Sequence, residues 1–127
     1  MAKVLAQRER STDLGVVRIN NEAIMTIASI AAMDVRGVYK MGGGIGRTLC
    51  DSLFKRSSAR GVRINMKEGE ARLTVSIVVE YGVDVPRIAD EVQENVKRAV
   101  EKMTGLVLSE VDVVVEGVHG QPPSVKK

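Results

Sequence analysis

The clearest pattern in the chain is an alternating strand, a long helical stripe and a second alternating strand, one after another. Apolar residues occupy every second position of residues 73–79, which is the period of a half-buried strand. After Tyr81-Gly82, apolar residues recur at spacings of three and four, as in an amphipathic helix: Val85, Ile88, Ala89, Val92, Val96, Ala99, Val100 and Met103. The period of two returns over residues 111–115. The sequence therefore predicts two strands joined by a helix long enough to cover a sheet.

The polar residues of this predicted helix have structural explanations. Asp84 is placed to cap the first turn, and Pro86 falls where a missing amide hydrogen is tolerated. Gly105 stands where a left-handed residue commonly ends a helix. Acidic residues occupy the first half and basic residues the second, which the helix dipole favours. We therefore interpret the charged face as solvated surface.

Weaker patterns predict the remaining elements. A short strand at residues 15–19 is followed by a helix that Asn20 or Asn21 caps and Gly37 ends. The apolar positions of that helix are Ile24, Ile27, Ala28, Ala31 and Val35. Further strands are predicted at residues 38–41 and 62–66, and residues 67–70 form a polar hairpin connection.

These elements predict an α+β fold in the order β-α-β-β-β-α-β. Two long helices are expected to pack on one face of a small mixed sheet. We expect a single domain over residues 14–118, between a flexible N-terminal tail (1–13) and a flexible C-terminal tail (119–127). Within the domain, residues 42–60 are predicted to form a mobile loop with a short amphipathic helix.

That segment holds the candidate docking site. An apolar stripe at i, i+4 and i+8 is surrounded by basic residues, and it either closes over the sheet as extra core or binds a partner helix or an anionic membrane surface. The candidate partner-docking residues are Ile45, Arg47, Leu49, Leu53, Phe54, Lys55 and Arg56.

The distribution of charge argues against nucleic acid as a partner. The net charge of +3 comes from the two tails, because residues 14–125 contain fourteen basic and fourteen acidic residues. A protein that tracks a nucleic-acid backbone needs a concentrated positive face. The basic tails favour solubility instead.

The glycine run at residues 42–46 invites two phosphate-binding interpretations. A P-loop fails, because Met41 stands where its first glycine belongs and Arg47 where its lysine belongs. Residues 43–46 match the GXXG loop of KH-type RNA-binding proteins, and that alternative stays open. The chain has only three aromatic residues for stacking bases: Tyr39, Phe54 and Tyr81. We interpret the glycines as a flexible hinge.

The sequence offers no catalytic or metal-binding constellation. His119 is the only histidine and Cys50 the only cysteine, which excludes a Cys/His zinc set and an internal disulfide. We interpret Cys50 as a small apolar filler in a reducing compartment. Residues 1–10 lack the apolar core of an export signal, and no apolar run is long enough to span a bilayer. We expect a non-enzymatic protein with no cofactor, no metal and no membrane-spanning segment.

Several segments together resemble the alkaline shock proteins of Gram-positive and related bacteria, also called envelope stress response proteins. The matching stretches are GVVRINNEAIMTIASIAAMDVRGVYKM, GVRINM, LTVSIVVEYGVDVPRIADEVQENVKRAVEKMTGL and SEVDVVVEGV. They cover nearly all of residues 15–118, although residues 42–60 match only loosely. The specificity lies in the combination of these motifs in this order.

The resemblance implies a cytoplasmic, non-enzymatic scaffold or regulatory protein that forms homo-oligomers and supports the cell envelope. It also implies recruitment to the inner face of the cell membrane by a separate, membrane-anchored protein partner. Other branches of the family are tied to fatty-acid synthesis, which leaves regulation of acetyl-CoA carboxylase by direct contact as an alternative. The family supplies no catalytic residues to carry over to this chain.

Overall fold

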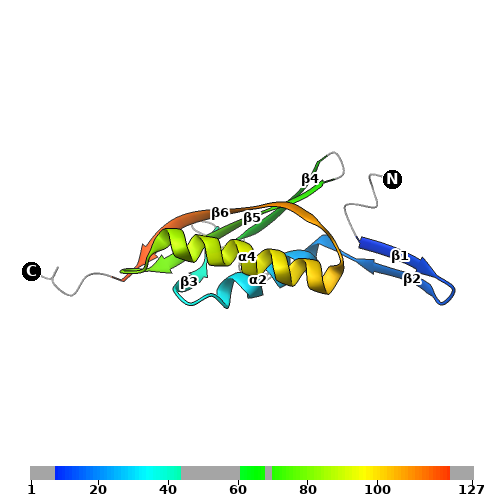
Figure 1. Cartoon of the computed structure of the whole chain (residues 1–127), viewed down its shortest axis with the longest axis horizontal. Coiled ribbons are helices and arrows are strands. Elements are labelled where there is room, and N and C mark those ends of the chain that lie inside the picture. The colour runs from blue at the N-terminus through cyan, green and yellow to red at the C-terminus, as the bar shows by residue number, and fades with distance from the viewer. Residues whose placement is uncertain (1–7, 44–60, 68–69, 121–127) are drawn as a thin grey trace, which may run out of the picture.

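The computed structural model describes residues 8–43, 61–67 and 70–120 (Figure 1). The elements follow one another as β1 (Arg8–Thr12), β2 (Gly15–Ile19), α2 (Asn21–Met33), β3 (Val38–Met41), β4 (Val62–Lys67), β5 (Glu70–Glu80), α4 (Val85–Thr104) and β6 (Leu108–His119). Both helices lie on the same side of the main sheet, as Figure 1 shows. The predicted α+β class is confirmed.

Strand β5 is the centre of the main sheet, because it pairs with three other strands. β6 runs parallel to it along the whole of one edge. On the other edge, β4 pairs antiparallel with residues 70–75 of β5, and β3 pairs antiparallel with residues 77–79. β3 and β4 therefore lie end to end, and the chain leaves and rejoins the sheet at neighbouring points.

The core lies between the sheet and the two helices. The fully buried side chains of β5 and α4 alternate or recur as the sequence pattern predicts: Leu73, Val75, Ile77, Val79, Ile88, Val92, Val96 and Val100. α2 contributes Ile24 and three buried alanines, and the small alanine side chains let it approach α4 closely. The Asn95 side chain of α4 donates a hydrogen bond to the Ala31 carbonyl at 2.8 Å, which ties the two helices together.

The predicted caps are present at both ends of α4 but not at the start of α2. The Asp84 carboxylate accepts a hydrogen bond from the Arg87 amide at 3.4 Å, and Gly105 ends α4 in the left-handed conformation with φ 79°. Both features agree with the prediction. At α2 the N-cap position is Asn20, but its side chain makes no capping hydrogen bond.

The N-terminal region differs from the sequence prediction. A flexible tail is predicted over residues 1–13, whereas the structure has strand β1 at Arg8–Thr12, paired antiparallel with β2. The residues of β1, RERST, have no apolar alternation, so only the pairing with β2 reveals the strand. The order of elements consequently has one strand more than predicted. At the other end, β6 continues through His119, one residue beyond the predicted domain boundary.

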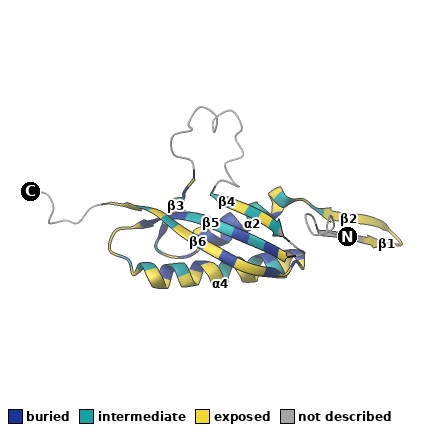
Figure 2. Ribbon diagram, turned by 90° about the horizontal axis from the view of Figure 1, so that it is seen from above, coloured by how far each residue is buried: buried dark blue, intermediate teal, exposed yellow. Residues whose placement is uncertain are grey.

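The β1–β2 hairpin forms a two-stranded sheet separate from the main one. It projects from one end of the body in both views (Figures 1 and 2). Buried residues concentrate in the body, whereas β2 is exposed at four of its five positions (Figure 2).

Candidate functional site

The seven residues predicted to dock a partner lie outside the described residues: Ile45, Arg47, Leu49, Leu53, Phe54, Lys55 and Arg56. The structure describes the place where their segment joins the sheet. We call this place the strand junction and define it by five residues: Gly42, Gly43, Gly61, Ser76 and Glu116. The docking role itself remains a prediction.

The strand junction holds both ends of the segment on a single residue of β5. The Gly42 amide donates to the Ser76 carbonyl at 2.8 Å, and the Ser76 amide donates to the Gly61 carbonyl at 2.7 Å. A Cβ atom built on Gly43 would lie 3.3 Å from the Gly61 Cα atom. The chain therefore departs from β3 and returns to β4 within contact distance.

Two glycines of the junction have close neighbours. A Cβ atom on Gly42, which is buried, would meet the end of the Glu116 side chain, and that flexible side chain can move aside. A Cβ atom on Gly61 would lie 3.0 Å from the Gly42 carbonyl oxygen, and Gly61 also has a left-handed φ of +85°. Backbone atoms and a positive φ therefore restrict a side chain at Gly61, whereas at Gly42 only the Glu116 side chain stands in the way.

Glu116 reaches the junction because β6 is bulged at this position. Val115 pairs with Ile77 and Gly117 with Val78, so that Glu116 is the extra residue between them. Its Oε1 atom accepts a hydrogen bond from the Gly43 amide at 2.8 Å. This places a carboxylate beside the first glycine of the GXXG sequence, where an RNA phosphate would be repelled.

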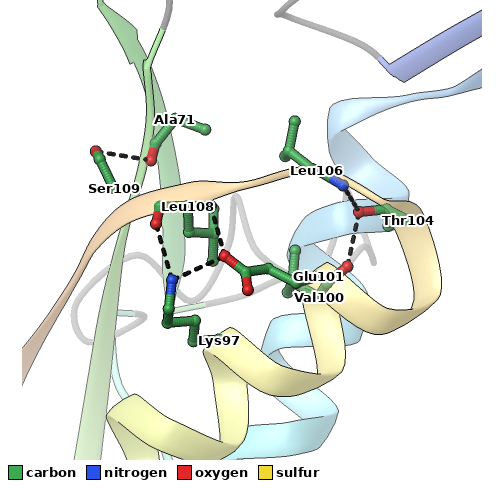
Figure 3. A network of polar contacts seen from close by, with 8 residues as sticks. All are labelled: Ala71, Lys97, Val100, Glu101, Thr104, Leu106, Leu108 and Ser109. Atoms are coloured by element: carbon green, nitrogen blue, oxygen red, sulfur yellow. Dashed lines mark hydrogen bonds and ion pairs between the residues drawn. The ribbon is translucent and has the colours of Figure 1, made fainter.

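A second polar cluster joins the end of α4 to β6 (Figure 3). Lys97 Nζ lies 2.8 Å from Glu101 Oε2 and donates to the Leu108 carbonyl at 3.1 Å. The Leu108 amide donates to the same Glu101 oxygen at 2.9 Å. The hydrogen bond from Lys97, and then the one from the Leu108 amide, lowers the pKa of the Glu101 carboxyl below its ordinary value. These groups hold one another in place, which is a structural role.

The face of the sheet that points away from the helices is polar and mixed in charge. Arg72 on β5 lies 3.7 Å from Glu110 on β6, measured from Nε to Oε1. Asp112 and Thr74 are register partners, and Arg63 pairs with Thr74 from the other side. Within the described residues this face therefore alternates basic and acidic groups instead of concentrating positive charge.

The described residues form no cluster of catalytic or metal-binding side chains. One hollow of about 300 Å³ lies between the end of α2 and α4, beside Asp34, Glu91 and Arg98. His119 stacks on Tyr39 with ring centroids 3.6 Å apart. No group of three or more His, Cys, Asp or Glu side chains in the described part is arranged to hold a metal ion. In the same residues, no helix is long and apolar enough to cross a membrane.

Comparison with known proteins defines the class of this fold. The model of the alkaline shock protein 23 family, described as having a cell envelope-related function, matches residues 9–120. The chain therefore belongs to the alkaline shock protein 23 family, as the resemblance of its motifs predicted.

The relatives include proteins of Bacillus subtilis and Streptococcus pyogenes. The chain is 32% identical to YqhY of Bacillus subtilis, covering 91% of this chain and 86% of the relative. It is also 32% identical to YloU of the same organism, covering 91% and 98%. A Streptococcus pyogenes protein named as a stress response regulator gls24 homolog is 31% identical, covering 80% of this chain and 57% of the relative.

Among solved structures, the chain is similar to variants of MamM. One MamM CTD variant has a TM-score of 0.46 and 21% identity, covering 76% of this chain and 93% of that chain. A second MamM variant has a TM-score of 0.47 and 19% identity, covering 80% and 89%. These values describe a distant likeness.

Proposed function

We propose that the chain is a non-enzymatic scaffold of the envelope stress response, which self-associates and docks a protein partner at the inner face of the cell membrane. One observation carries the proposal: large apolar side chains are exposed on the β1–β2 hairpin and on α2, whereas the described surface holds no cluster of reacting groups. Leu14 is 98% exposed and Ile30 is 64% exposed. Several exposed apolar residues on one element, in contrast to scattered single ones, mark an interaction surface.

Membership of the family supports one part of the proposal, the role in the cell envelope and in stress. Its description gives a cell envelope-related function, and one relative is named as a stress response regulator. Neither the description nor these names assigns a chemical reaction. Binding, rather than catalysis, is the activity that this pattern favours.

The docking part of the proposal concerns residues 44–60. Their predicted apolar stripe with a basic rim suits a partner helix that is apolar on one face and acidic at its margins. The strand junction supports the role, since both ends of the segment are held at one point of the sheet edge by backbone hydrogen bonds. A partner bound to the segment would thus be coupled to β3, β4 and β5.

The test is crosslinking in the native bacterial cell followed by mass spectrometry, with Leu49→Asp/Leu53→Asp compared with wild type. Thr48→Asp/Ser52→Asp is the matched control, because it adds the same charge beside the predicted stripe. The proposal expects one protein partner to be crosslinked by wild type and control and lost with the Leu49/Leu53 variant. Retention of every partner by that variant would exclude the segment as the docking site.

A filter-binding assay and the same crosslinking experiment separate the two alternative functions, RNA binding and regulation of fatty-acid synthesis. An RNA-binding protein would bind mixed RNA in a filter assay, with an affinity that falls steeply as salt rises and that is lost with Gly44→Asp. A regulator of fatty-acid synthesis would crosslink to acetyl-CoA carboxylase. The scaffold proposal expects neither result.

A further inference from the structure

Helix α2 leaves an apolar face uncovered. Its thirteen residues include a single charged one, Glu22. On the side away from the core, Ala23 is exposed, Ile30 is 64% exposed and Met33 is 42% exposed. A helix at a protein surface normally carries polar residues on its solvent side, as α4 does. We call the line of Ala23, Ile30 and Met33, together with the half-buried Ile27 that also packs against the core, the outer face of α2.

The β1–β2 hairpin also has apolar side chains that nothing in its own chain covers. Leu14 at its turn is 98% exposed, and Val16 and Val17 on β2 are 59% and 55% exposed. Neighbouring residues of a strand point to opposite faces, so Val16 and Val17 lie on different faces of the hairpin. Each face therefore exposes one valine. An isolated two-stranded hairpin is marginally stable in water and needs a third strand or a helix to pack against.

The hairpin does not cover the α2 of its own chain. β2 ends at Ile19 and α2 begins at Asn21, so that Asn20 alone joins them. Both views show the hairpin continuing beyond the body while α2 runs back into it (Figures 1 and 2). The apolar residues of the hairpin and the outer face of α2 therefore lie on opposite sides of Asn20 along the chain's long direction.

We propose that each hairpin packs on the outer face of α2 in a second copy of this chain, in a reciprocal two-fold dimer. This inference rests on the self-association in the proposed function and names the surfaces involved. A five-residue strand is about 17 Å long and a thirteen-residue helix about 20 Å long, so the hairpin and the outer face match in length. A two-fold axis beside Asn20 lays each hairpin along the other copy's α2, and such a contact closes on itself.

The geometry also predicts which residues meet. At about 3.3 Å per strand residue, Leu14 lies about 20 Å from Asn20, and at 1.5 Å per helix residue Met33 lies at the same distance. By the same measure, Val17 and Ile27 both lie about 10 Å from Asn20. The arrangement thus places Leu14 against Met33, and Val17 against Ile27, of the other copy. Each pair is apolar.

Charge favours a hairpin-to-helix contact over a helix-to-helix or a hairpin-to-hairpin contact. Residues 8–19 contain three basic and two acidic residues, a net charge of +1. Residues 20–34 contain two acidic residues, Glu22 and Asp34, and no basic one, a net charge of −2. Hairpin against helix therefore joins opposite charges, whereas helix against helix or hairpin against hairpin joins like charges.

Disulfide trapping tests the predicted pairing. Two full-length variants are made in a Cys50→Ser background, one carrying Leu14→Cys and the other Met33→Cys, and they are mixed and oxidised. We expect a disulfide between the two different chains, and little crosslinking of either variant alone, because a two-fold axis at Asn20 keeps like positions far apart. Leu14→Cys mixed with Val107→Cys is the control, since Val107 is 74% exposed but lies after α4.

Four outcomes would overturn the inference. Met33→Cys crosslinking to itself would indicate helix against helix. A disulfide formed within one chain carrying both cysteines would indicate that the hairpin folds back. Absence of the mixed disulfide in a protein that sediments as an oligomer would refute these surfaces and leave the proposed self-association intact, whereas a protein that sediments only as a monomer would refute both.

A charge on the outer face gives an independent measurement. Ile30→Glu is expected to raise the dimer dissociation constant about 100-fold or more in sedimentation equilibrium, because it buries a carboxylate among apolar groups in both halves of the dimer. Val114→Glu is the matched control, because Val114 is 44% exposed on β6, away from α2. Equal weakening by the two substitutions would overturn the inference.

Discussion

The strand junction makes a prediction that separates a steric role for Gly42 from a flexible one. A Cβ atom at residue 42 would lie 2.4 Å from Glu116 Oε1 and 2.9 Å from its Cδ atom, so the Glu116 side chain must move when Gly42→Ala is introduced. Moving it breaks the 2.8 Å hydrogen bond from the Gly43 amide. The effect of Gly42→Ala should therefore depend on whether Glu116 is present.

The size of that dependence follows from the bond that is lost. A hydrogen bond to a charged acceptor contributes roughly 1.5–3 kcal/mol, which we reduce to about 1 kcal/mol because Glu116 is exposed. Gly42 is not among the glycines with positive φ, so replacing it also gains about 0.4–1 kcal/mol by restricting the unfolded chain. Gly42→Ala should consequently be close to neutral in wild type and stabilising by about 0.4–1 kcal/mol in a Glu116→Ala background.

A double-mutant cycle in urea measures the coupling directly. Unfolding of wild type, both single variants and the double variant is followed by circular dichroism, and a coupling free energy of about 1 kcal/mol is expected. The same coupling would appear as a shift of about 4 °C in the melting temperature of a domain of this size. Additive effects, with Gly42→Ala equally costly in both backgrounds, would show that the carboxylate does not occupy the space beside Gly42.

Three further predictions concern the frame that carries the proposed surfaces. Gly61→Ala should destabilise the fold by about 1 kcal/mol more than Gly82→Ala, because both have positive φ but only Gly61 has backbone atoms within 3.1 Å of the new Cβ; equal melting temperatures would contradict this. Because the folded pKa of Glu101 is lowered, its stabilising contribution is complete above the ordinary value of 4.5 and is lost as pH falls through the folded pKa. Urea unfolding at several pH values should therefore show the gap between wild type and Glu101→Gln closing in acid, and a gap that stays constant would refute the network's role. Val96→Ala should cost about 2 kcal/mol since Val96 is fully buried on α4, whereas Met103→Ala, at a side chain 66% exposed, should cost less than about 0.5 kcal/mol in the same unfolding assay.

The helix α4 shows why much of the fold could be predicted from sequence. Its apolar stripe is regular over twenty residues, and its N-cap and C-cap residues, Asp84 and Gly105, make local contacts within a few residues of themselves. β5 was equally predictable, because Leu73, Val75 and the later inward residues alternate without interruption. Local periodicity and local capping were sufficient for these elements.

The features that sequence reasoning missed depend on their pairing partners and not on a pattern of their own. Strand β1 has no apolar pattern of its own and exists through its register with β2. The end-to-end placement of β3 and β4 depends on Ser76, which bonds Gly42 on one side of the segment and Gly61 on the other. The Glu116 side chain reaches Gly43 only because a bulge in β6 adds one residue. The sequence could identify Gly42 as unusual, but not the Glu116 carboxylate that packs beside it.

The proposed function requires this chain to bind other protein chains through its surface, beginning with a second copy of itself. Sedimentation equilibrium of the full chain, from low micromolar to several hundred micromolar, tests it most directly. We predict a reversible dimer whose population rises with concentration and falls with Ile30→Glu. A single monomeric species at every concentration would contradict the account.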